Sequence, residues 1–158
     1  MALVKRYALE SQRDPSVRLL AETVVQHIGS KDYLSEILAV YYFVLRHCRY
    51  ANDPRTVELV KRPEWVAKQM AAGGTPSLDC DDLTAFLAAL LMSLGREVRA
   101  VTVAFKDAFH NGERQYSHIY VQVREPRSNK WITLDPVAAE EMGTMLRRVT
   151  AMKIWPIA

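Results

Sequence analysis

Apolar residues recur at helical spacing through most of the first half of the chain. The spacing predicts helices over residues 14–28, 35–48 and 63–70. Asp14 and Pro15 open the first of these segments, where they suit the N-cap and the first turn of a helix. We therefore expect residues from about 14 to 70 to form a helical N-terminal part.

A fourth and more regular apolar face begins at Asp79 or Cys80 and runs to Leu94, where Gly95 ends the pattern. Its apolar residues fall where one face of a helix would bury them: Leu83, Phe86, Leu87, Leu90, Leu91 and Leu94. This segment predicts a long helix packed on the rest of the core.

After Gly95 the period changes to that of strands. Strands are predicted over 98–103, 116–124 and 130–134, and the turn-forming residues between the last two predict a hairpin. The polar segment 106–115 contains Asn-Gly, a strong turn signal. The last 20 residues show no pattern that assigns them. Helices followed by an antiparallel sheet predict an α+β fold.

Length and composition point to one domain over residues 1–158, because no repeat or long linker divides the chain. The net charge of +3 is spread out, without a polybasic tail, which argues against nucleic acid as a partner. No apolar run approaches the roughly 20 residues that span a bilayer, and the N-terminus lacks an apolar signal region. We therefore expect a cytoplasmic protein without a membrane partner. The two cysteines are too few for a disulfide framework.

Three residues of the second half could carry chemistry. Cys80 opens the long helix, whose N-terminus supplies partial positive charge and free N–H groups that favour a thiolate. His118 lies in a predicted strand and Asp135 follows the next one, so their side chains can meet across the hairpin. A histidine can take the thiol proton, and a carboxylate on its other nitrogen fixes its tautomer and orientation. The pattern predicts a nucleophile, its base and an orienting group.

One feature opposes this prediction, because Asp79, Asp81 and Asp82 flank the cysteine and negative charge raises the pKa of a thiol. Carboxylates also suit the first turn of a helix. We expect some of them to cap the helix and point away from sulfur. An active Cys80 should then have a pKa below its ordinary value.

These residues resemble the transglutaminase-like superfamily over about residues 78–137. Segment 79–100 resembles its nucleophile segment, in which a Cys opens a helix that ends in Leu-Gly before a strand. Segment 117–123 resembles the histidine strand, although His-Ile-Tyr stands where many relatives have His-Ala-Trp. Segment 131–136 resembles the aspartate segment, with a Trp before Asp-Pro. Residues 50–54 extend the likeness weakly.

The resemblance implies a papain-like α+β core with the nucleophile helix packed on a small antiparallel sheet. It also implies acyl transfer through a Cys80 thioester: hydrolysis, deamidation or transamidation of a peptide or isopeptide amide, with no cofactor. Relatives complete the oxyanion site with an upstream side chain, and three residues are candidates here: Tyr50, Trp65 and Gln69. The compact form is most similar to phage and prophage members.

Other functions remain possible. An assembly or interaction protein of a virion could keep the fold and the triad without catalysis, with a phage structural protein as its partner. A cell-wall amidase is a third possibility. A metal site is not expected, because no second Cys or His lies at ligand spacing and the acidic residues do not match an EF-hand. Cys48 lies on an apolar helical stripe and is expected to be structural.

Overall fold

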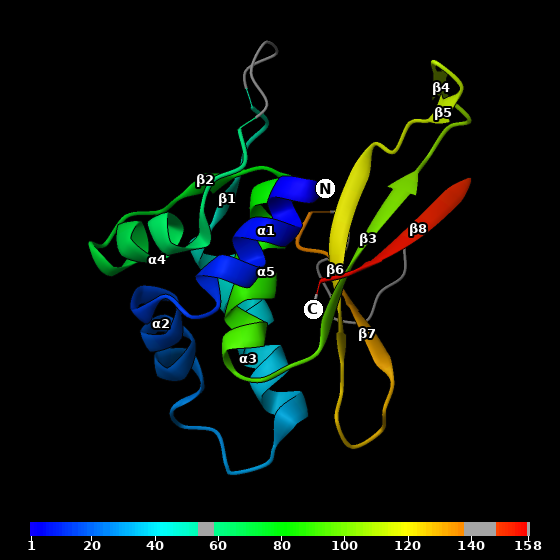
Figure 1. The fold of residues 1–158 in the computed structure, drawn as a ribbon. Coiled ribbons are helices and arrows are strands. Elements are labelled where there is room, and N and C mark those ends of the chain that lie inside the picture. Colours follow the sequence, from blue (N-terminus) through cyan, green and yellow to red (C-terminus); the bar gives the residue numbers. More distant parts are fainter. Residues whose placement is uncertain (54–58, 138–147, 158) are drawn as a thin grey trace.

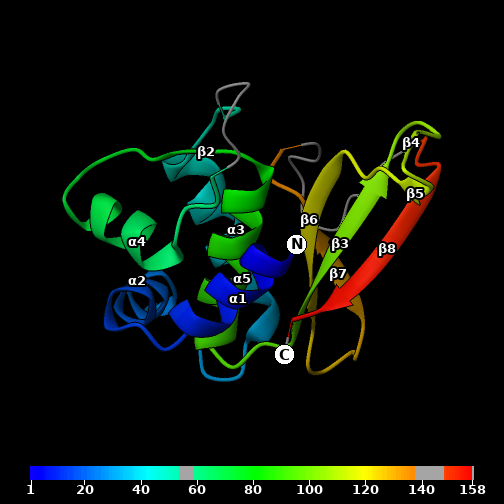
Figure 2. The same ribbon diagram turned by 45° about the horizontal axis from the view of Figure 1, so that its top comes forward.

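The computed structural model describes residues 1–53, 59–137 and 148–157, and in this part of the chain a layer of helices packs against one face of a small sheet (Figures 1 and 2). The helices are α1 (Ala2–Ser11), α2 (Pro15–Val25), α3 (Tyr33–His47), α4 (Pro63–Ala71) and α5 (Cys80–Ser93). The α+β class is confirmed, as are the four predicted helices, with ends shifted by a few residues. Of the described helices, none is long and apolar enough to cross a membrane.

The main sheet has four antiparallel strands in the order β7-β6-β3-β8. These strands are β3 (Val98–Ala104), β6 (His118–Arg124), β7 (Trp131–Leu134) and β8 (Ala151–Pro156). Two short pairs lie outside it: β1 (Arg49–Tyr50) runs parallel to β2 (Ser77–Leu78), and β4 (Phe109–His110) pairs with β5 (Glu113–Arg114). Asn111 and Gly112 join β4 to β5 with positive φ angles, as the Asn-Gly signal predicts.

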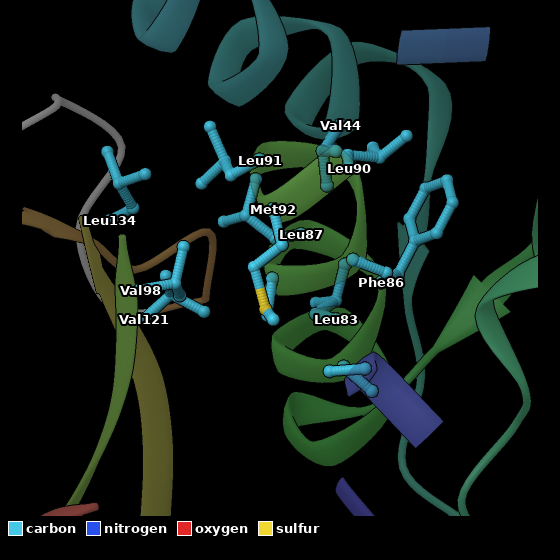
Figure 3. Packing of buried hydrophobic residues seen from close by; sticks show 14 of the residues in the cluster. Val44, Leu83, Phe86, Leu87, Leu90, Leu91, Met92, Val98, Val121 and Leu134 are labelled. Atoms are coloured by element: carbon cyan, nitrogen blue, oxygen red, sulfur yellow. The ribbon is translucent and has the colours of Figure 1, made fainter. Parts of the chain in front are cut away.

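Helix α5 lies at the centre of the core, between the other helices and the sheet (Figure 1). Residues 82–92 are all buried, so α5 is covered on every side and not along one stripe alone. Figure 3 shows Leu87 and Leu91 between the helical layer and the sheet residues Val98, Val121 and Leu134. This packing fixes the start of α5 relative to β6 and β7, which is what the candidate site requires.

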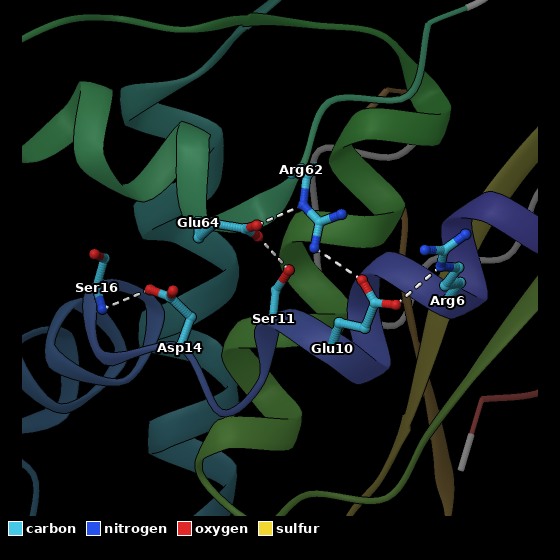
Figure 4. A network of polar contacts seen from close by, with 7 residues as sticks. All are labelled: Arg6, Glu10, Ser11, Asp14, Ser16, Arg62 and Glu64. Carbon is cyan, nitrogen blue, oxygen red and sulfur yellow. Dashed lines mark hydrogen bonds and ion pairs between the residues drawn. The ribbon is translucent and has the colours of Figure 1, made fainter.

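Two longer elements, strand β8 and helix α1, are absent from the sequence prediction, as are the two-residue strands β1, β2, β4 and β5. Strand β8 pairs with β3 from Arg99↔Pro156 to Ala104↔Ala151. Because β8 is an edge strand, its apolar residues Met152 and Ile154 remain exposed, and the usual alternation of buried apolar and exposed polar residues is not visible in its sequence. Helix α1 is held by tertiary contacts, including Ser11 Oγ donating to Glu64 Oε2 at 2.5 Å and Arg62 to Glu10 at 2.8 Å (Figure 4). Local pattern does not report such contacts. Part of the unassigned C-terminal segment, residues 139–147 and 158, lies outside the described residues.

Candidate active site

The start of α5 is fixed by a reciprocal cap. The Asp82 N–H donates to Asp79 Oδ1 at 2.9 Å, and the Asp79 N–H donates to Asp82 Oδ2 at 3.3 Å. Asp82 is fully buried and also accepts from Lys61, through Nζ at 2.7 Å and the backbone N–H at 2.6 Å. The expectation that some of the flanking carboxylates cap the helix is confirmed. Cys80 therefore occupies the first helical position in a tightly held turn.

The surroundings of Cys80 favour the neutral thiol. Burial raises the pKa of the thiol to about 11, with further increases from the negative charges of Asp81 and Asp79. The backbone N–H groups of Ile119 and of Cys80 itself act in the opposite direction and do not outweigh them. The expected lowering of the Cys80 pKa is therefore wrong, because desolvation of the thiol outweighs the effect of the helix N-terminus.

His118 and Asp135 form the second half of the site. His118 Nε2 lies 2.8 Å from Asp135 Oδ2, and both side chains are buried. The Val137 N–H donates to Asp135 Oδ1 at 3.1 Å, and the Tyr41 hydroxyl of α3 donates to the Asp135 carbonyl at the same distance. Since a carboxylate accepts, Nε2 carries the proton of a neutral imidazole, and Nδ1 is left as the basic nitrogen.

The two halves meet at the beginning of β6. The Ile119 N–H that acts on the Cys80 sulfur belongs to the residue next to His118. Strand β7 reaches only to Leu134, which pairs with Val121, so it does not cover the first residues of β6. The effect of the Ile119 N–H on the pKa of Cys80 indicates that the sulfur lies near the first residues of β6. The structure thus brings the three predicted residues into one region.

Two aromatic rings flank His118. Phe105 is stacked with it at a centroid distance of 6.2 Å and an interplanar angle of 24°. Tyr120 lies 6.1 Å away on the next residue of the same strand face. Tyr120 is 1% exposed and its hydroxyl has no hydrogen-bond partner, whereas Phe105 is 40% exposed. One ring therefore belongs to the interior and the other faces solvent.

The three oxyanion candidates are placed differently. Tyr50 pairs with Leu78 in the β1–β2 ladder, and Leu78 lies two residues before Cys80 in the chain. Burial raises the pKa of Tyr50, and Cys80 and Asp79 add to the rise, as expected for a phenol near the sulfur. Its hydroxyl donates to Asn52 Oδ1 at 2.7 Å. Trp65 and Gln69 lie on α4, on the side of the helical layer away from the sheet (Figures 1 and 2), and Trp65 is 68% exposed. Tyr50 is thus the candidate that lies by the sulfur.

The acidic residues near the site also approach one another. Asp53, Asp79 and Asp82 each offer an oxygen atom, and these atoms lie within 4.8 Å of one another. The Lys61 ammonium lies among them, 2.7 Å from Asp82 and 3.9 Å from Asp53. This ammonium supplies the compensating charge that a cation would otherwise bring. The arrangement is an ion-pair network that fixes the start of α5.

A family model described as the transglutaminase-like superfamily matches residues 21–136. The chain belongs to the transglutaminase-like superfamily. The match contains Cys80, His118 and Asp135, and it extends well upstream of the segments on which the sequence resemblance rests. A comparison with curated proteins finds no match.

Two solved structures share the fold of this chain. A candidate cysteine protease from Cytophaga hutchinsonii superposes with a TM-score of 0.55 at 16% identity, over 89% of this chain and 46% of that one. A candidate protease from Parabacteroides distasonis gives the same TM-score at 12% identity, over 81% of this chain and 25% of that one. The chain thus spans less than half the length of either protein. At these identities the likeness establishes the fold alone.

Sequence reasoning missed several residues that shape the site. Tyr41 lies within the predicted helix 35–48, but its hydrogen bond to the Asp135 backbone spans 94 positions and leaves no local signal. Lys61 lies in a segment without clear periodicity. Phe105 follows a strand at the edge of a polar segment, where a lone aromatic residue does not indicate a contact with histidine. All three depend on tertiary arrangement.

Proposed function

We propose that the protein catalyses thiol-dependent acyl transfer on a peptide or isopeptide amide, through a thioester on Cys80. The observation that carries the proposal is the His118–Asp135 pair at 2.8 Å, next to Ile119, whose backbone N–H acts to lower the pKa of the Cys80 thiol. The family and the protease neighbours support thiol-based catalysis at the level of the superfamily.

Each residue of the site has a role in the proposed reaction. His118 Nδ1 takes the thiol proton as the sulfur attacks the amide carbonyl, because the raised pKa leaves about one thiol in ten thousand ionised at neutral pH. Asp135 holds the ring and stabilises the imidazolium. The Cys80 N–H, at the start of α5, and the Tyr50 hydroxyl are the donors proposed for the oxyanion. His118 then protonates the leaving amine, and water or an amine attacks the thioester.

Acyl-enzyme formation provides the test. The protein is treated with p-nitrophenyl acetate, and the acetyl adduct is located by mass spectrometry of the intact chain and of its peptides. We expect the adduct on Cys80, with a rate that falls by at least about a hundredfold in His118→Ala. Cys48→Ala is the matched control, because burial raises the pKa of that thiol to about 12 and it should not compete. Equal labelling of the two cysteines, or no effect of His118→Ala, would contradict the proposal.

A second candidate is favoured by one observation. The thiol is held neutral and the histidine is buried, as expected for an assembly or interaction protein that keeps the triad but occludes it. The similarity to small phage and prophage members suggests a virion structural protein as its partner. This function predicts a protein without a Cys80 adduct that co-purifies with virions, and Cys80→Ala would leave virion assembly intact.

A further inference from the structure

The position of His118 defines where the leaving group of the proposed reaction must lie. In amide cleavage through a thioester, the histidine that accepts the thiol proton next delivers it to the departing nitrogen. The amine side of the substrate therefore passes close to the His118 ring. Side chains that lie beside this ring and face solvent would contact the residue that follows the cleaved bond.

Phe105 meets both conditions. It follows the end of β3, two residues beyond Val103, which pairs with His118, so its side chain lies on the same face of the sheet as the histidine. Its ring is stacked with that of His118 at 6.2 Å, and it remains 40% exposed. The other neighbour, Tyr120, is buried and cannot be reached from solvent. Phe105 is thus the flanking ring that is available to a substrate.

We propose that Phe105 determines specificity on the amine side of the reaction, by packing against an apolar or aromatic side chain of the leaving or incoming amine. This inference rests on the proposed acyl transfer and adds its substrate class. A contact between aromatic rings contributes about 1 kcal/mol beyond the area that it buries, which corresponds to about a fivefold preference.

The same subsite serves the reverse step, in which an amine attacks the acyl-enzyme. The amine nitrogen forms a bond to the thioester carbonyl carbon, and the carbon–sulfur bond breaks. The proton lost by the nitrogen passes to His118 and then to the Cys80 sulfur, which restores the thiol. Water attacks in the same way and gives the free acid, so the ratio of amide to acid reports how well the amine is bound.

The test compares two amines that differ in their side chain alone. The acetyl-enzyme formed with p-nitrophenyl acetate is partitioned between water and either phenylalaninamide or glycinamide, and the products are quantified by mass spectrometry. Parallel reactions of Cys80→Ala give the uncatalysed background. We expect phenylalaninamide to reach half-maximal amide formation at about one fifth of the glycinamide concentration.

Two variants separate a specificity role from other effects. Phe105→Ala should remove the preference for phenylalaninamide, so that both amines behave alike. Phe109→Ala is the matched control, because Phe109 is 60% exposed, stacks under Arg114 and is not in ring contact with His118; it should keep the preference. If Phe105→Ala slows hydrolysis and both aminolysis reactions equally, Phe105 positions the histidine and the proposal is overturned.

The outcomes also distinguish this inference from the function on which it rests. An acetyl-enzyme that forms on Cys80 but accepts both amines equally in the wild type overturns the specificity proposal alone. If no Cys80 adduct forms, the acyl-transfer function fails and the inference fails with it.

Discussion

At the residue scale, the Cys80 thiol is governed by burial and by two carboxylates. Asp81 is the larger electrostatic contributor to its raised pKa. Asp81→Asn should therefore lower the pKa of Cys80 and increase its rate of alkylation by iodoacetamide at pH 7 by about threefold. The part of the elevation that is due to burial and to Asp79 should remain. Glu22→Gln, an equal charge change on the exposed face of α2, is the control. An unchanged rate in Asp81→Asn would show that its carboxylate is screened from the sulfur.

Asp79 links the same site to stability. Burial, together with nearby carboxylates, raises its pKa to about 6 from an ordinary 3.8, so the folded state binds more protons between these values. Its ionisation should lower the free energy of unfolding as the pH rises from 4 to 6. Asp79→Asn keeps a good N-cap residue and should gain about 1 kcal/mol relative to the wild type over this range, since the carboxylate is partly exposed. Urea titrations at pH 4 and 6.5 measure the difference, and a constant difference would contradict the assignment.

At the scale of elements, the buried Asp82 joins the start of α5 to the segment before α4. Lys61 supplies both an ammonium and a backbone N–H to it, so removing the ammonium leaves a buried carboxylate with fewer partners. Lys61→Met should lower the free energy of unfolding by about 2 kcal/mol, and a second change, Asp82→Asn, should recover part of the loss. Arg6→Met breaks the exposed pair with Glu10 and should cost less than about 0.5 kcal/mol. Chemical denaturation of these three variants and the wild type gives the comparison.

The elements also show how far the sequence could predict the molecule. The strong periodicity of α5 and the alternation of β6 are local, and both were predicted with nearly the observed ends. The placement of the three candidate site residues followed from these elements, together with the hairpin before β7. Helix α1 and strand β8 could not be predicted, because long-range packing stabilises them more than their own pattern does. The prediction of a lowered pKa for Cys80 failed for a similar reason, because the whole fold decides how deeply the thiol is buried.

At the scale of the whole molecule, the candidate site is divided between two layers. Cys80 begins a helix of one layer, whereas His118 begins a strand of the other and Asp135 directly follows a strand. The hydrogen bond from the Tyr41 hydroxyl of α3 to the Asp135 carbonyl joins the two layers. Their relative position depends on the apolar contacts between α5 and the sheet (Figure 3). The geometry of the site is therefore only as exact as the packing between the layers. Small displacements in that packing should change the reaction rate more than the free energy of unfolding.

This dependence predicts different effects on the reaction rate for two core residues that are equally buried. Leu134→Ala and Leu90→Ala should each lower the free energy of unfolding by about 3 kcal/mol, because both side chains are fully buried. Leu134 directly precedes Asp135 and lies at the contact between sheet and helix, so its loss should also slow acetylation of Cys80 by about tenfold. Leu90→Ala should change this rate by less than about twofold, since it lies on the helical side, away from the histidine. Rates are compared at a temperature where both variants are folded. Equal slowing in the two variants would mean that global stability, and not the position of Asp135, limits the reaction.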